Sequence, residues 1–192
     1  AGIELVIYGD LLDRLEPPPR QDRLAEFLYG PEPGGPPALL RYPQGLLVVG
    51  DTVLVGDQGF PDVMAVDLRG GTVRRWTARS GRPACPVQLA EGGAGRVIVV
   101  DPSQRGVLIY DRDGRLESTL YGPGVPDAQS ATWRPSAALV HAGVLHVADP
   151  ALPGAHRYEL ASGEWIAAVG DARSPFVAPT GLAMTGDGVL LV

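Results

Sequence analysis

The stretch Gly95–Gly122, GRVIVVDPSQRGVLIYDRDGRLESTLYG, decides the fold. It predicts three short strands in a row, over residues 97–100, 107–110 and 116–120. An Asp-Arg-Asp-Gly tetrapeptide that ends at Gly114 separates the last two and predicts a hairpin turn. The first two strands are apolar at every position, so both faces of this antiparallel sheet should be buried. Such a sheet needs a similar sheet on each side, and this predicts a repeat.

The chain carries that repeat as four sequence markers. They are a proline followed by a leucine, an aspartate that ends a β-rich run, an acidic residue with a glycine at a turn, and a closing Leu-Tyr-Gly-Pro. The prolines, at spacings of 43, 49 and 44 residues, are Pro43, Pro86, Pro135 and Pro179. The aspartates, 14 or 15 residues after their prolines, are Asp57, Asp101 and Asp149. Four short strands within such a period are typical of β-propeller blades.

The pattern Pro-x-Gly-Leu, then an apolar residue-x-Val-x-Asp, then a strand ending in Asp-x-x-Gly, resembles the NHL repeat over about residues 41–192. The resemblance implies an all-β fold, a β-propeller of four-stranded antiparallel blades. The first unit departs from the pattern, with Trp76 and Thr77 in place of the closing Tyr-Gly, and the third has Ala138 where glycine is usual. We expect one propeller domain over 1–192, with blades at 43–79, 86–122 and 135–170 and the start of a blade at 179–192.

Residues 1–30 are expected to supply the end of a blade plus a loop insertion, from strands at 3–8 and 23–30, because RLAEFLYG aligns with RLESTLYG of the second unit. The sequence then holds four blades' worth, whereas six is the common number in the resembled family. A compact four-bladed ring and a piece of a six-bladed ring are the two alternatives. We favour the piece, because the last unit ends inside its second strand. In a closed ring of four, residues 3–8 would pair with residues 188–192.

Composition limits the classes of function. Hydrophobic residues make up 45% of the 192, enough for a core, and the net charge of -6 without a basic stripe argues against nucleic acid as a partner. No stretch approaches the roughly 18 apolar residues of a membrane span. The single cysteine, Cys85, allows no internal disulfide, which fits a cytoplasmic as well as a periplasmic location. Neither lysine nor asparagine occurs, as a GC-rich bacterial genome would explain.

We predict no catalytic residue, cofactor or metal from the motifs. The repeated aspartates could form a ring of carboxylates, but an aspartate after a strand more often caps its own turn by accepting backbone N–H bonds. No phosphate-binding loop, Ser-His-Asp order or Cys/His metal spacing is present. The histidines His141, His146 and His156 all fall in one unit, and the first two would lie about 16 Å apart along a strand. This is too far for one ion unless the hairpin folds back.

A binding surface is the better prediction. Arginine and tryptophan are favoured at interfaces, and several lie in or beside loops that should share one propeller face. The candidate binding residues are Phe60, Arg82, Arg105, Trp133, Arg134 and His156. His156 is included because it begins a strand beside a variable loop. The alternative is that a protein without lysine uses arginine wherever it needs a surface cation.

Two functions of different class follow. The first is a non-catalytic propeller scaffold or accessory subunit that binds a protein partner through loops on one face. The second is a metal-dependent lyase or lactonase of the NHL type, which would act on a small molecule near the propeller axis. We favour the first, because strong scaffold motifs stand beside no catalytic constellation, and fold-level resemblance alone does not assign a reaction.

Overall fold

The computed structural model describes residues 40–60, 62–77, 85–122, 133–151, 154–170, 176 and 178–192. The chain divides into two compact units, Ala1–Arg41 and Tyr42–Val192, and almost all described residues belong to the second. The expected strands at 3–8 and 23–30 lie outside the described residues. The proposed pairing of residues 3–8 with 188–192 therefore stays a prediction.

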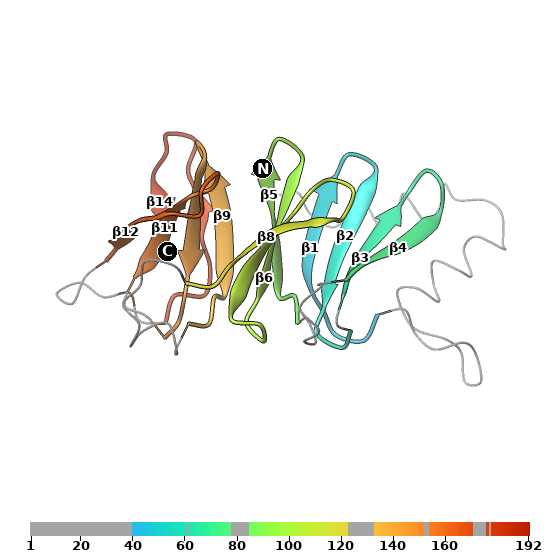
Figure 1. The fold of residues 1–192 in the computed structure, drawn as a ribbon, viewed down its shortest axis with the longest axis horizontal. Coiled ribbons are helices and arrows are strands. Elements are labelled where there is room, and N and C mark those ends of the chain that lie inside the picture. The colour runs from blue at the N-terminus through green and yellow to red at the C-terminus, as the bar shows by residue number, and fades with distance from the viewer. Residues whose placement is uncertain are drawn as a thin grey trace. The chain divides into compact units, whose positions relative to one another are not determined.

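The described residues form only β-strands, arranged as three four-stranded antiparallel sheets and one hairpin (Figure 1). We call the sheets blades 1 to 3. Blade 1 consists of β1 (Pro43–Val49), β2 (Thr52–Asp57), β3 (Asp62–Asp67) and β4 (Thr72–Thr77). Blade 2 consists of β5 (Gln88–Gly93), β6 (Arg96–Asp101), β7 (Gly106–Tyr110) and β8 (Leu116–Leu120). Blade 3 consists of β9 (Ala137–His141), β10 (Val144–Ala148), β11 (Ala155–Glu159) and β12 (Trp165–Val169), and the hairpin of β13 (Ala183–Met184) and β14 (Leu190–Leu191).

The strands of each blade pair in chain order, as the repeat predicts. In blade 2 the strands β6, β7 and β8 contain the three segments predicted from the sequence. The predicted turn between β7 and β8 is present too. Gly114 adopts a φ of 81° there, and its N–H donates to the Asp111 carbonyl over 3.1 Å. Local patterning therefore determines the blades: apolar runs make the central strands, and glycine allows the turn's positive φ.

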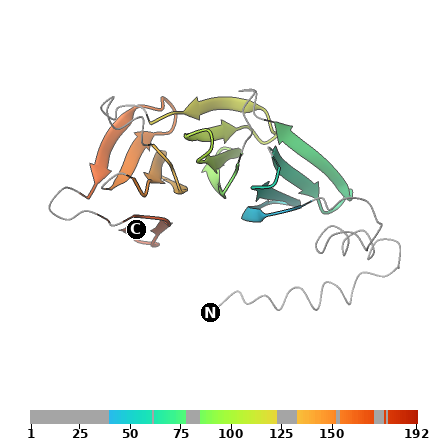
Figure 2. The same cartoon turned by 90° about the horizontal axis from the view of Figure 1, so that it is seen from below.

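The blades pack face to face in chain order, as Figures 1 and 2 show. One buried cluster joins blade 1 to blade 2 around Leu54, Val63 and Tyr110, and a second joins blade 2 to blade 3 around Ile98, Val107 and Val147. The first strands of the blades, β1, β5 and β9, lie next to one another. Blade 2 is thus buried on both faces, which is what its fully apolar central strands predict.

A side chain ties the first strands of blades 2 and 3 together. The amide of Gln88 on β5 makes two hydrogen bonds to the backbone of Ala138 on β9. Its Nε2 donates to the Ala138 carbonyl over 3.0 Å, and its Oε1 accepts from the Ala138 N–H over 2.9 Å. Ser136 makes a comparable link onward, because its Oγ donates to the Pro179 carbonyl just before the hairpin.

The blade-closing residues pack on turn glycines of the next blade. Trp76 on β4 pairs with Val63, as Leu120 on β8 pairs with Val107, so the two positions are equivalent. A Cβ at Gly114 would lie 2.2 Å from the Trp76 indole nitrogen. The tryptophan that departs from the repeat pattern therefore takes the place of the closing leucine.

No helix among the described residues is long and apolar enough to cross a membrane.

Candidate functional site

The three repeated aspartates lie at one end of the blades, which we call the aspartate end. Asp57 and Asp101 end the second strands of their blades, Asp149 directly follows its second strand, and all three are at most 1% exposed. The marker prolines and the loops between second and third strands lie at the same end, because Pro43 pairs with Asp57 and the blades pack in register.

Asp101 shows what these carboxylates do. Its Oδ1 accepts from the N–H of Ser103 (3.0 Å), the Ser103 hydroxyl (2.6 Å) and the N–H of Gln104 (3.1 Å). Its Oδ2 accepts from the Cys85 N–H (2.8 Å) and from Nε2 of Gln104 (2.9 Å). Both oxygens therefore carry several hydrogen bonds within the protein, which leaves the carboxylate poorly placed to act on a ligand.

The same bond pattern recurs in the other blades. Asp57 accepts from the N–H groups of Gly59, in its own turn, and Tyr42, over 2.6 and 2.9 Å. Asp149 accepts from those of Ala151 and Arg134, over 2.7 and 2.5 Å. The distant donors, Tyr42, Cys85 and Arg134, are the residues immediately before the marker prolines. The capping interpretation is confirmed, and each aspartate also fastens the segment that leads into its blade.

Phe60 lies in the β2–β3 loop and is half-buried under an arginine. The Arg75 guanidinium carbon stands 5.1 Å from the centre of the Phe60 ring. Arg75 also forms an ion pair with Asp62, with 3.6 Å between Nη1 and Oδ2. The Arg75 side chain is 46% exposed, so this stacked pair presents a cation and an aromatic edge to solvent at the aspartate end.

Trp133 and His156 lie in the core rather than on a surface. Trp133 is 1% exposed, and its ring meets the His156 ring edge-on at 5.6 Å and the Tyr158 ring at 6.2 Å. His156 is 5% exposed, and neither of its ring nitrogens has a hydrogen-bond partner. Burial lowers the pKa of the His156 imidazole, while the Asp149 charge opposes that shift. Neither side chain offers exposed area to a partner in this conformation.

The predicted arginines separate into two groups. Arg105 in the β6–β7 loop and Arg134 before β9 are both exposed at the aspartate end. Arg82 lies outside the described residues. Of the six candidates, Phe60, Arg105 and Arg134 are thus placed at one end of adjacent blades. Arg75 and the 67%-exposed Tyr42 join them there; the sequence analysis did not single them out, although the arginine–aromatic theme pointed to residues of their kind.

The other two histidines differ in environment. His141 at the end of β9 is exposed, and His146 within β10 is 6% exposed. Burial, with the nearby Arg157 and His141, lowers the pKa of His146. Among the described residues, no group of three or more His, Cys, Asp or Glu side chains is placed to hold a metal ion.

Solved structures resemble the chain in fold only. Hydrazine synthase from Kuenenia stuttgartiensis is 16% identical, with a TM-score of 0.61 over 79% of this chain and 41% of that one. Virginiamycin B lyase from Staphylococcus aureus is 14% identical, with a TM-score of 0.62 over 78% of this chain and 47% of that one. The computationally designed protein Ika4 is 12% identical, with a TM-score of 0.55 over 78% and 88% of the two chains.

The fold is a β-propeller. The propeller sequence spans less than half the length of the matched synthase and lyase chains. No protein-family model matches it, and no curated protein matches its sequence. At these identities the likeness concerns the fold alone and does not assign an activity.

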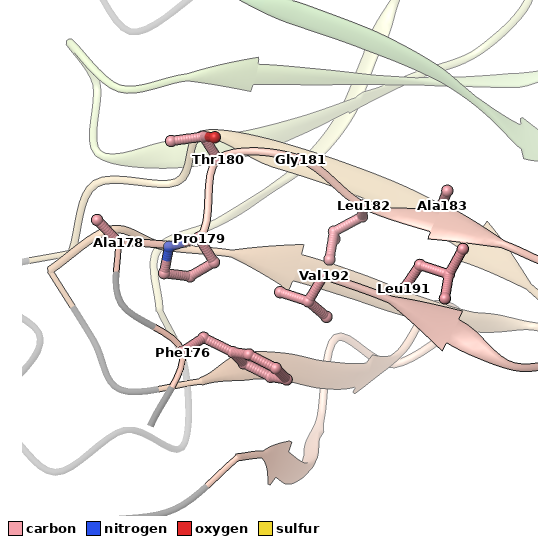
Figure 3. A pocket seen from close by; sticks show the side chains of 9 residues that line it. All are labelled: Phe176, Ala178, Pro179, Thr180, Gly181, Leu182, Ala183, Leu191 and Val192. Carbon is pink, nitrogen blue, oxygen red and sulfur yellow. The ribbon is translucent and has the colours of Figure 1, made fainter. Parts of the chain in front are cut away.

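A hollow of about 590 Å³ lies against the β13–β14 hairpin of the propeller. Figure 3 shows the side chains of Phe176, Leu182, Leu191 and Val192 around it. None of its lining residues is ionisable, and Thr180 provides the only side-chain hydroxyl. The hollow can accept apolar groups, but its described lining offers neither a general acid nor a general base.

Proposed function

We propose that this chain is a non-catalytic propeller of the NHL type that binds a protein partner through its aspartate end. One observation carries the proposal. Every exposed charged side chain that the structure describes at this end is an arginine, and the exposed Tyr42 and the Phe60–Arg75 stack lie among them. The arginines are Arg75, Arg105 and Arg134.

The buried carboxylates of the repeated aspartates also support this proposal. Asp57, Asp101 and Asp149 are buried and used in holding the loops, so they fix the surface instead of performing chemistry on it. Arginine and aromatic side chains match the composition of interface hot spots, and loops that are already held in place lose little conformational freedom on binding. The NHL assignment rests on the repeat markers in the sequence.

Photo-crosslinking tests the proposal with a matched pair of positions. Tyr42 at the aspartate end is 67% exposed, and Leu68 in the β3–β4 turn at the opposite end is 58% exposed. Each is replaced in turn by p-benzoylphenylalanine in the source cells, and the products are identified by mass spectrometry. We expect a discrete partner adduct from position 42 and none from position 68. Equal adducts from both positions, or none from position 42, would overturn the proposal.

An enzyme acting on a small molecule is the second candidate. The fold likeness to virginiamycin B lyase favours it, together with the two unpartnered nitrogens of buried His156 near the aspartate end. The metal content of the purified chain separates the two candidates. A tightly held divalent ion in stoichiometric amount, lost together with a turnover activity on chelation, would support the enzyme over the scaffold.

A further inference from the structure

The face of blade 3 that points away from blade 2 differs from the equivalent faces of the other blades. Pairing registers define the equivalence, since one position on each second strand lies three residues before the repeated aspartate. In blade 1 this position and its third-strand partner are Leu54 and Ala65. In blade 2 they are Ile98 and Ile109. Blade 3 has His146 and Arg157 instead, which we call the polar pair.

The apolar versions of this pair fill the contacts between blades. Leu54 and Ala65 belong to the buried cluster that joins blade 1 to blade 2, and Ile98 and Ile109 to the one that joins blade 2 to blade 3. In blade 3 the neighbouring pair is also smaller, with Ala148 and Ala155 where blade 2 has Val100 and Val107. A guanidinium and an imidazole beside two small side chains are unsuited to a purely apolar contact between blades.

The polar pair has hydrogen-bonding atoms without partners. His146 is 6% exposed, and its Nδ1 is buried with no hydrogen bond, as is Nε of Arg157. Among the described residues, no carboxylate forms an ion pair with Arg157. A buried donor without an acceptor destabilises the folded state, so an acceptor at this place would stabilise the protein.

The charges near the pair select the kind of acceptor. Arg157 and His141 are the neighbours whose charge lowers the pKa of His146, and both have basic side chains. His141 also borders the β13–β14 hairpin, because a Cβ at Gly188 would lie 3.8 Å from its Nε2. Neighbouring arginine and histidine donors, with no carboxylate paired to them in the described part of the chain, match an anion with several acceptor oxygens.

We propose that the polar pair binds a small oxyanion, a carboxylate or phosphate group, between blade 3 and the hairpin. The Arg157 guanidinium supplies the charge and directed N–H donors, and His146 donates from Nδ1. This site is distinct from the aspartate end and does not depend on the proposed scaffold function.

Thermal unfolding of the full chain tests the site. Inorganic phosphate and malonate are compared with chloride at equal ionic strength. We expect phosphate, malonate or both to raise the Tm by about 3 °C beyond chloride, since a ligand that binds only the folded state stabilises it. A response to phosphate alone assigns a phosphate site, and a response to malonate a carboxylate site. A chain that both anions stabilise no more than chloride would refute the proposal.

The double variant His146→Ile/Arg157→Ile restores the pair found in blade 2 and should abolish the anion response while the protein still folds. If it does not fold, Arg157→Met alone serves the same purpose. Arg112→Gln, which removes an exposed arginine from the β7–β8 turn, is the control and should keep the full response. The imidazole nitrogen resonances of His146 should shift with added phosphate. Either variant keeping the wild-type anion response, or unmoved resonances, would show that the polar pair is not the site.

Discussion

Asp101 couples two segments that are distant in sequence. One oxygen holds the turn that follows β6, while the other holds Cys85, 16 residues earlier, just before the marker proline. A proline has no N–H, so the nearest backbone donor on its N-terminal side is the N–H of the residue that precedes it. That donor is used by the aspartate in all three described blades. The proline and aspartate markers thus belong to one hydrogen-bonded arrangement that recurs in each described blade.

Replacing Asp101 with alanine should destabilise the fold by about 3 kcal/mol, because it leaves several buried donors without an acceptor. This exceeds the roughly 1 kcal/mol of an ordinary lost cap, since Asp101 accepts five hydrogen bonds. Asp101→Asn, which keeps one acceptor oxygen, should lose less. Urea unfolding measures both changes. An alanine variant with the wild-type midpoint would contradict the structural role.

The buried histidines make stability depend on pH. Burial lowers the pKa of His156, and burial with Arg157 and His141 lowers that of His146, so the unfolded chain binds protons more readily than the folded one. Their contribution is complete above the unfolded pKa of about 6.5 and is lost as the pH falls through the lower folded values. The free energy of unfolding should therefore decline from pH 7 to 5, and less steeply in His156→Phe. An identical slope in that variant would contradict this account.

At the residue level the sequence predicted the hydrogen bonds of the aspartates better than it predicted which aromatic side chains are buried. The aspartate caps follow from residue type and position, because a carboxylate after a strand has backbone donors within reach. The burial of Trp133 was not predictable in this way. It depends on the approach of Tyr158 and His156 from a strand more than 20 residues later, and no local pattern reports that contact. The polar pair was also missed, because its meaning appears only when pairing registers align the blades.

At the scale of elements, the turns between third and fourth strands fit the closing strand of the preceding blade. Gly114 has a φ of 81° and meets Trp76 of blade 1, whereas a Cβ at Gly71, which has a φ of 63°, would meet no atom within 4 Å. The two glycines share the backbone requirement, but only one is also confined by a neighbouring side chain. Turn geometry and contact between blades can therefore be separated by experiment.

Gly114→Ala should cost clearly more stability than Gly71→Ala. The second variant should lose about 1 kcal/mol for the left-handed backbone alone, and the first should lose that and the cost of displacing the Trp76 indole. Trp76→Leu, which copies Leu120 of blade 2, should recover part of the loss when it is combined with Gly114→Ala. Chemical denaturation of the four variants measures these differences.

Equal losses in Gly71→Ala and Gly114→Ala, or no recovery in the double variant, would contradict the Trp76 contact.

The strands themselves were predictable, since apolar runs and turn residues located β6, β7 and β8 to within a residue at each end. The contacts between blades were not, as the Gln88–Ala138 link joins residues 50 apart. A repeat predicts that neighbouring blades touch, but the residues that meet depend on the packing of two faces.

At the scale of the molecule, the described blades differ in how completely they are covered. Blade 2 contributes to both buried clusters, with Ile98 and Val107 on one face and Val99 and Leu108 on the other. These four side chains are at most 2% exposed. The β13–β14 hairpin has two-residue strands, and Val189 and Leu191 there are 51% and 52% exposed. Local stability should follow this gradient, because opening a covered strand exposes more apolar area.

Native-state hydrogen exchange should therefore be slowest in peptides that span residues 96–110. Opening these strands disrupts both clusters at once, so their amides should exchange only through the largest unfolding event. Peptides over residues 183–191 should exchange much faster, since their two-residue ladder can open without disturbing either cluster. Mass spectrometry across a time course measures both. If residues 106–110 exchanged as fast as the hairpin, packing of blade 2 between its neighbours could not be the main source of stability. The order of protection thus tests the central place of the stretch that first indicated the fold.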